Sequence, residues 1–566
     1  MHQHAEGIAG ALPGKRAVRR NEELGDFTTT WRVLPISLLA IGIGAICAFV
    51  ALALLRLIGL FTHLFYYGNW GGSLISPAGN HLGYWSVLVP VAGGLIVGVM
   101  ARFGSERIRG HGIPEAIEAI LMNGSRVEPK VAFLKPVSSA IAIGSGGPFG
   151  AEGPIIMTGG AVGSMIAQLF HLTSAERKTL LVAGAAGGMS ATFASPVAAI
   201  LLAVELLLFE MRPRSLVPVA AASVVAAALR IVWLGAGPLF PVTLPAGFSI
   251  TRALLIALPL GALIGLVAAG LSRLMYTLED AFEHVGGKLH IHWAWWPAIG
   301  GIGVGIGGYF FPRALGVGYD NIAELLRGSA PITFIVGIIV AKSLMWAFSL
   351  SSGTSGGVLA PLLMIGAALG EGAAQLAHLP TEAQAMGALI GMGAMLAGAL
   401  GVPLTAILFS LELTHAMPAL LPLIPACVGA YLVTSLLMPR SILTEKLARR
   451  GHHLSREYGV DPLETIYVAE VMKTVPGPNS IGYNAPALGD AFAYSDETCR
   501  SVAERMVTEE VVRMPVIDRT TGEICGSIGL NELLAGRRRA MQRETERTRA
   551  FQVQEESEPV TESTRS

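Results

Sequence analysis

Glu152 is the only acid in an apolar stretch, GSGGPFGAEGP, that ends at Pro154. Proline is favoured in the first turn of a helix, because its missing N–H would have no partner there. Pro154 therefore predicts a helix start at which the N–H groups of Ala151, Glu152 and Gly153 stay free. Such a start attracts anions. A carboxylate tethered there is either an ordinary first-turn acid or an anion that competes with a bound one.

Two further stretches have the same form and predict two more helix starts. They are GHGIP, from Gly110 to Pro114, and GVLAP, from Gly357 to Pro361. Three half-helices with converging positive ends would bind an anion without a lysine or arginine that traps it. We therefore expect Glu152 to act as a gate, which fills this site when it is deprotonated and opens it when it is protonated or displaced.

The composition predicts a membrane protein. The chain has 566 residues, of which 52% are hydrophobic and 14% charged, whereas soluble proteins are about a quarter charged. Charge-free runs long enough to span a bilayer, which takes about 20 residues, are Val33–Leu55, Leu82–Ala101, Ala253–Ser272, Trp293–Pro312 and Met417–Pro439. An ionisable residue at membrane depth is functional as a rule, which favours the gate over the ordinary acid.

Several other functional classes are disfavoured. The net charge is zero, which gives no reason to expect nucleic-acid binding. The four cysteines form no CxxC pair, so no metal site or disulfide framework is expected. We expect no cofactor and no enzyme, because no nucleophile–base set or HExxH motif is present. Residues 1–32 do not resemble a signal peptide, and basic residues beside the apolar runs predict cytoplasmic termini in a plasma (inner) membrane.

An internal repeat organises the apolar part. Gly150–Leu169 is similar to Gly357–Leu376, and Ser195–Leu206 is similar to Val402–Leu413. Both pairs have one offset, since 361 − 154 = 207 and 403 − 196 = 207. We interpret residues 130–213 and 332–439 as homologous halves. Repeats with short, Gly/Pro-interrupted helices are typical of transporters whose site lies near the bilayer midplane.

These motifs resemble the CLC family of chloride channels and proton/chloride exchangers, over residues 31–451. The resemblance implies an all-α membrane fold, an inverted repeat with broken half-helices, a homodimer in the lipid bilayer with one anion path per subunit, and Glu152 as the gate. The residues expected to face a chloride or another small anion are Gly110, His111, Gly112, Ile113, Gly150, Ala151, Gly153, Val358, Leu359 and Leu443.

Four departures from the family pattern concern transport. His111 replaces a serine, Leu359 a phenylalanine and Leu443 a tyrosine, and Leu206 stands where exchangers have a proton-transfer glutamate. The histidine is a possible proton relay that titrates near neutral pH, or a neutral ring that fills space or caps its helix. The departures favour passive or weakly coupled, channel-like flux. The alternative is a proton-coupled chloride antiporter.

Glu205, beside Leu206, is the second possible proton relay. Its repeat partner is Glu412, since 412 − 205 = 207. An acid that occurs in both halves favours a structural role for Glu205 over a relay.

The chain after residue 451 predicts a small cytoplasmic α/β domain. After a linker at 452–465, residues 466–540 resemble a CBS domain, with strands at 513–518 and 524–528 and a helix at 531–540. Gly529 and Glu532 replace the Thr and Asp of nucleotide-binding units, which argues against adenine-nucleotide binding. Residues 1–30 and 541–566 are expected to be a cytoplasmic segment and a disordered charged tail. A membrane sensor that signals through this domain is the alternative from another class.

Overall fold

The computed structural model describes residues 29–242, 250–452, 461–474 and 491–545. The chain divides into two compact units, residues 1–455 and 456–566. The predicted N-terminal segment, most of the linker and most of the tail lie outside the described residues.

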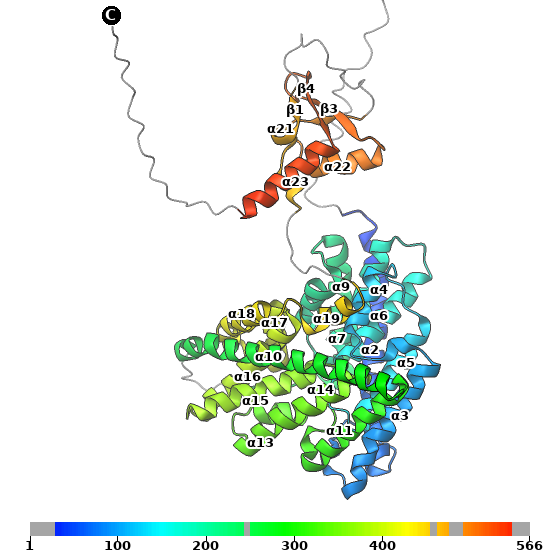
Figure 1. Cartoon of the computed structure of the whole chain (residues 1–566), viewed down its shortest axis with the longest axis vertical. Helices are drawn as coiled ribbons and strands as arrows, with labels where there is room; N and C mark the ends of the chain where they lie inside the picture. The colour runs from blue at the N-terminus through cyan, green and yellow to red at the C-terminus, as the bar shows by residue number, and fades with distance from the viewer. Residues whose placement is uncertain (1–28, 243–249, 453–460, 475–490, 546–566) are drawn as a thin grey trace, which may run out of the picture. The chain divides into compact units, whose positions relative to one another are not determined.

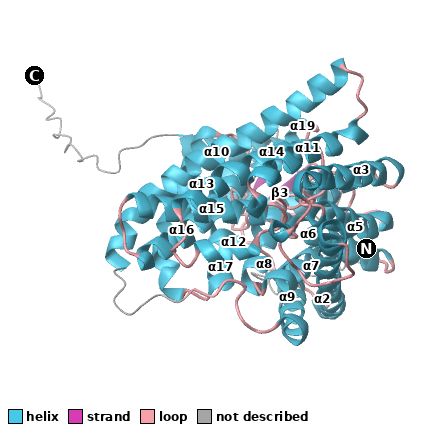
Figure 2. Cartoon of the chain, turned by 90° about the horizontal axis from the view of Figure 1, so that it is seen from below, coloured by secondary structure: helices cyan, strands magenta, loops and turns pink. Residues whose placement is uncertain are grey.

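The first unit is helical (Figures 1 and 2). Its α-helices up to residue 288 are α2 (Val33–Thr62), α3 (Leu88–Phe103), α4 (Ile113–Leu121), α5 (Pro129–Gly144), α6 (Glu152–Gln168), α7 (Ser174–Phe193), α8 (Pro196–Leu202), α9 (Pro213–Leu234) and α10 (Ile250–Lys288). They are followed by α11 (Trp296–Phe310), α12 (Tyr319–Leu325), α13 (Ile332–Gly337), α14 (Ser343–Ser351), α15 (Leu359–Leu376), α16 (Thr381–Leu400), α17 (Pro403–Thr414), α18 (Leu420–Leu437) and α19 (Ile442–Arg449). Three π-helical segments are η1 (His63–Tyr67), η5 (Ala203–Leu208) and η8 (Ile338–Lys342).

This unit is a multi-pass membrane domain. Within the described residues, eight helices are long and apolar enough to span a bilayer. Four of the five predicted runs lie in these spans, apart from Leu82 at the start of one run. The fifth, Trp293–Pro312, is divided into a short 3-10 turn and α11, a helix of 15 residues. Pro312 ends that helix, because the residue before a proline avoids helical backbone angles.

The two halves pack in the same way. α6 lies against α7, and α15 lies against α16. A Cβ on Gly159 would lie 2.3 Å from the Gly184 carbonyl oxygen, and one on Gly366 would lie 2.4 Å from that of Gly391. Each glycine of the first contact has its counterpart in the second 207 residues later. Glycine therefore allows close backbone contact at matching places in the two halves. The neighbours also correspond, since α2 packs on α7 and α9 as α10 packs on α16 and α18 (Figures 1 and 2).

The second unit contains a four-stranded sheet in the order β1-β4-β3-β2, within the described residues. The strands are β1 (Lys473–Thr474), β2 (Ala493–Tyr494), β3 (Arg513–Ile517) and β4 (Ile524–Gly529), and the helices are α20 (Pro462–Thr465), α21 (Val468–Val471), α22 (Cys499–Thr508) and α23 (Leu530–Thr545). The predicted strand–turn–strand–helix order is confirmed. Glu532 accepts a hydrogen bond from the Gly529 N–H at 2.9 Å, so this acid caps its own helix.

Candidate functional site

Three helix starts meet, as the motifs predict. α4 begins at Ile113, α6 at Glu152 and α15 at Leu359. The strand-like loops before α6 and α15 are joined by two hydrogen bonds, from Gly150 N to Gly357 O at 3.2 Å and from Gly357 N to Gly150 O at 2.9 Å. Gly356 N also donates to Gly110 O, at 3.4 Å, which ties the α4 loop to the same place.

Two glycines allow this convergence. A Cβ on Gly153 would lie 1.9 Å from the His111 carbonyl oxygen, and one on Gly112 would lie 2.8 Å from that of Gly153. Gly112 also has a φ of 91°, which disfavours any other residue. The predicted anion-facing residues are all buried in the structure: Gly110, His111, Gly112, Ile113, Gly150, Ala151, Gly153, Val358, Leu359 and Leu443.

Glu152 is fully buried, with 0% of its surface exposed. A Cβ on Gly150 would lie 1.7 Å from its Oε2, and one on Gly357 would lie 2.9 Å from it, so the carboxylate covers both glycines. It approaches the Ala360 N–H in the first turn of α15, although neither oxygen makes a hydrogen bond of ordinary geometry among the described residues. The carboxylate therefore lies at the helix starts, where a bound anion would lie.

Two buried lysines brace the loops, and the sequence reasoning missed them. Lys135 Nζ donates to Ile108 O at 2.8 Å and to Gly110 O at 2.7 Å. Lys342 Nζ donates to Ala314 O at 3.0 Å and to Gly316 O at 2.7 Å. The repeat was the available signal, because 342 − 135 = 207. Because each ammonium is bound by backbone carbonyl oxygens, neither lysine is expected to serve as a ligand of the anion.

His111 does not cap its helix. Both ring nitrogens are buried without a hydrogen-bond partner among the described residues, and Glu115 accepts the Gly112 N–H at 3.0 Å instead. The capping interpretation of His111 is therefore wrong. Burial, together with the charges of Lys446 and Lys135, disfavours a positive ring. This leaves the imidazole as a neutral polar group with unused hydrogen-bonding capacity.

Glu205 and Glu412 each cap a helix that belongs to the other half. The Glu205 carboxylate accepts the Leu404 N–H at 3.2 Å and the Thr405 N–H at 2.8 Å, at the start of α17. The Glu412 carboxylate accepts the Val197 N–H at 2.9 Å and the Ala198 N–H at 2.8 Å, at the start of α8. This reciprocal contact favours the structural role of Glu205 over the relay.

Glu210 is a second acid close to Leu206 in sequence, and it was not considered in the sequence analysis. The π-helical η5 changes the register there, and π-helical turns are frequent at functional sites. Glu210 forms ion pairs with Lys178 at 3.3 Å and Arg214 at 3.2 Å. Burial raises the pKa of Glu210, but Lys178 and Arg214 outweigh burial and hold this pKa below its ordinary value.

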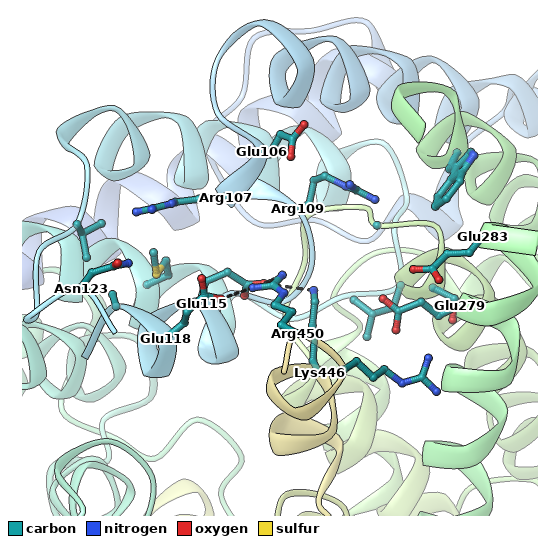
Figure 3. A pocket seen from close by; sticks show the side chains of 18 residues that line it. Glu106, Arg107, Arg109, Glu115, Glu118, Asn123, Glu279, Glu283, Lys446 and Arg450 are labelled. Carbon is teal, nitrogen blue, oxygen red and sulfur yellow. Dashed lines mark hydrogen bonds and ion pairs between the residues drawn. The ribbon is translucent and has the colours of Figure 1, made fainter. Parts of the chain in front are cut away.

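A charged cavity of about 660 Å³ adjoins α4, and we call it the α4-side cavity. Figure 3 shows Lys446 and Arg450 of the α19 region reaching Glu115 of α4, at 3.2 Å and 3.3 Å. Its described lining contains five acids, Glu106, Glu115, Glu118, Glu279 and Glu283, and five bases, Arg107, Arg109, Lys446, Arg449 and Arg450.

Leu443, the site of the family tyrosine, is buried at the start of α19. The Tyr276 hydroxyl donates a hydrogen bond to the carbonyl oxygen of the neighbouring Ile442.

A smaller cavity of about 130 Å³ adjoins α12, and we call it the α12-side cavity. It is lined by Ile58 and Thr62, at the end of α2. The α4-side cavity includes Asn123, whose neighbour Gly124 is bound by Arg177 at the start of α7. The preceding residue, Glu176, pairs with Arg32, just before α2, at 2.7 Å. The two cavities thus lie toward opposite ends of the 30-residue α2.

Comparison with known proteins decides the family. The sequence profile described as "Voltage gated chloride channel" matches residues 92–435. The chain is 32% identical over 397 residues to the protein named "H(+)/Cl(-) exchange transporter ClcA" of Citrobacter koseri, which covers 67% of this chain and 82% of that one. The relative of the same name in Vibrio campbellii is 32% identical over 390 residues, with 66% and 82% covered.

The chain belongs to the CLC family. Solved structures show the same fold. A slow cyanobacterial Cl−/H+ antiporter superposes with a TM-score of 0.64 and 22% identity, over 75% of this chain and 99% of that one. A CLC-type fluoride/proton antiporter superposes with a TM-score of 0.60 and 20% identity, over 74% and 98%. The protein is thus a CLC-type anion-transport protein in which three helix starts meet beside the buried Glu152.

Proposed function

We propose that this CLC protein is a proton-coupled chloride antiporter in which Glu152 serves both ions. The observation that carries the proposal is the buried Glu152 carboxylate over Gly150 and Gly357, neither oxygen of which makes a hydrogen bond of ordinary geometry to a residue that the structure describes. The names of the relatives support coupled exchange. They favour this alternative over the channel-like flux that Leu206 and Leu443 suggested.

The geometry supports a simple exchange cycle. A deprotonated Glu152 occupies the helix starts and excludes an anion from the same N–H groups. Protonation removes its charge, so the neutral carboxyl leaves and a chloride can take its place, held by the partial charges of α6 and α15. Release of the proton on the other side then returns the carboxylate. Because the same place holds either the carboxylate or the anion, the two movements are coupled.

The remaining assignments of the proposal follow the family and the charge distribution. We infer a homodimer, cytoplasmic termini and a plasma-membrane location, with transport unaccompanied by chemical conversion. Under this orientation the α4-side cavity faces the cytoplasm, because Arg32 lies toward its end of α2. The acids of this cavity, and the ion-paired Glu210, are the candidates to pass protons in place of the family glutamate that Leu206 replaces. The second unit is proposed as a regulatory CBS-like domain without bound nucleotide.

Proton movement in liposomes tests the proposal. The purified protein is placed in liposomes with an outward chloride gradient, and a potassium ionophore clamps the voltage. We expect the protein to move protons into the liposomes against their own gradient. A protein that passes chloride but never moves protons uphill would establish the channel-like reading. If the folded protein moves neither ion, the membrane sensor that signals through its second unit is the remaining interpretation.

A further inference from the structure

Tyr319 has a buried hydroxyl that no part of the exchange cycle uses. It is the first residue of α12, directly after Gly318 with a φ of 77°. The hydroxyl oxygen is inaccessible to solvent and has no hydrogen-bond partner among the described residues. A buried tyrosine hydroxyl usually has a partner, so this one is available for a group that arrives during the cycle.

The ring of Tyr319 is held in place by aromatic neighbours. It meets the edge of Phe193 at a centroid distance of 6.4 Å, and that of Phe240 at 5.8 Å. Both contacts are near-perpendicular, an arrangement that aromatic pairs favour. Phe193 is in turn packed on Phe409 at 5.4 Å. The hydroxyl is thus presented at a fixed place.

Tyr319 is linked to both the α12-side cavity and Glu152. Tyr319 lines the cavity, and Glu152 is the described charged group that acts electrostatically on its hydroxyl. The backbone joins the two residues, since Gly316 N, in the turn before α12, donates at 3.0 Å to Gly146 O in the loop before Glu152. Lys342 fixes the same turn through Gly316 O and is the described cation that acts on Glu152.

We propose that the Tyr319 hydroxyl receives the Glu152 carboxyl when it leaves the helix starts. This inference rests on the proposed role of Glu152 as the shared group. The phenol O–H donates to one carboxyl oxygen, while the other oxygen keeps the acid proton and passes it to water in the α12-side cavity. Tyr319 is a positioning residue, which retains its own proton throughout. The turns with positive-φ glycines at Gly110 and Gly112 and at Gly316 and Gly318 correspond with an offset of 206, one less than that of the rest of the repeat. The counterpart of Tyr319 is therefore Ile113, which has no hydroxyl.

The test is Tyr319→Phe in the full chain, which removes the hydroxyl alone. Chloride-driven proton uptake and chloride flux are measured in liposomes from about pH 4.5 to 7.5, in the wild-type and Glu152→Gln backgrounds. We expect Tyr319→Phe to slow coupled proton uptake about tenfold, the scale of one hydrogen bond to an ionisable group, and to shift its pH profile. It should leave chloride flux in the Glu152→Gln background unchanged. Tyr431→Phe, at a half-exposed position of α18, is the matched control.

Two results would overturn the inference. One is an equal loss of flux in both backgrounds, which would make Tyr319 an anion ligand or a packing residue. The other is unchanged proton uptake in the wild-type background. Failure of the proposed function has a different signature, because the wild type itself would then show no coupled proton uptake, or Glu152→Gln would keep it. The thermal midpoint of Tyr319→Phe in detergent separates misfolding from loss of the hydroxyl, and Tyr319→Leu, which loses the ring as well, should add a loss of stability.

Discussion

The two halves of the membrane domain share a scaffold and differ in their chemistry. In each half a buried lysine holds two carbonyl oxygens of a turn, and two glycines of that turn have positive φ. The first turn has Gly110 and Gly112, braced by Lys135. The second has Gly316 and Gly318, braced by Lys342. Glu205 and Glu412 complete the likeness, because each caps a helix of the other half.

The difference lies at the helix starts. Glu152 corresponds to Leu359, since 359 − 152 = 207, and His111 to Val317, since 317 − 111 = 206. A second carboxylate at Leu359 would lie beside the first and repel it. In our proposal the two halves supply helix starts to one anion site, and the single acid Glu152 gates it. The symmetric scaffold would then bind the anion, and the asymmetric acid would couple its movement to a proton.

The largest expected effect is at the asymmetric pair. Glu152→Gln removes the only gate carboxylate that our proposal uses, so coupled proton uptake should fall by about a hundredfold or more, while chloride flux persists with little pH dependence. Leu359→Ala in the other half should keep coupling. Both are measured as chloride-driven proton uptake in liposomes. Loss of all chloride flux in a folded Glu152→Gln protein would sink the gate assignment.

The lysine braces test whether the scaffold is truly equivalent. Lys135→Met and Lys342→Met each leave two buried carbonyl oxygens without a donor, which should lower the free energy of unfolding by about 3 kcal/mol or more. Thermal unfolding in detergent checks this, with Lys→Arg variants as controls. If only one substitution destabilises the protein, the two braces are not equivalent.

The reciprocal caps should have smaller and matched effects. Glu205→Gln and Glu412→Gln each weaken a helix cap, at a cost of about 1 kcal/mol, and neither should change the number of protons moved per chloride. Unfolding and proton uptake are measured on the same samples. Loss of coupling in Glu205→Gln with normal stability would restore the relay role.

His111 should affect selectivity more than pH dependence. His111→Ser exchanges a neutral ring for a hydroxyl, so we expect anion preference to change by about fivefold, the scale of one net hydrogen bond, with an unchanged pH profile. Val317→Ser in the other half is the control and should change neither. Competition between chloride and nitrate or fluoride measures the preference. Loss of acid activation in His111→Ser would mean that the ring carries a proton.

The smallest effect is expected from the second unit. Deletion of residues 466–566 leaves both repeats and every half-helix intact, so anion selectivity and proton coupling should stay as in the full chain. Rate and expression are free to change. Reversed anion preference in the folded, truncated protein would show that the two halves do not form the site alone.

Glu152, the three proline-marked helix starts and the repeat were predictable from the sequence, because helix-start chemistry and a constant offset are local or periodic signals. The preference for a structural role of Glu205 followed from the same offset. The braces were not predicted, since a lysine in an apolar helix does not reveal which carbonyl oxygens it reaches. The interpretation of His111 as a cap failed because the Glu115 carboxylate accepts the Gly112 N–H at the start of the helix.

The sequence by itself determined the membrane domain, its repeat and the position of one acid at a helix start, because these depend on composition, proline and spacing. Only the tertiary structure decided what lies around that acid. It brought Gly150 and Gly357 together, set Lys342 and Tyr319 near Glu152, and turned Glu205 toward the opposite repeat. These contacts join residues about 160 to 210 positions apart, and packing of whole helices rather than local preference specifies them.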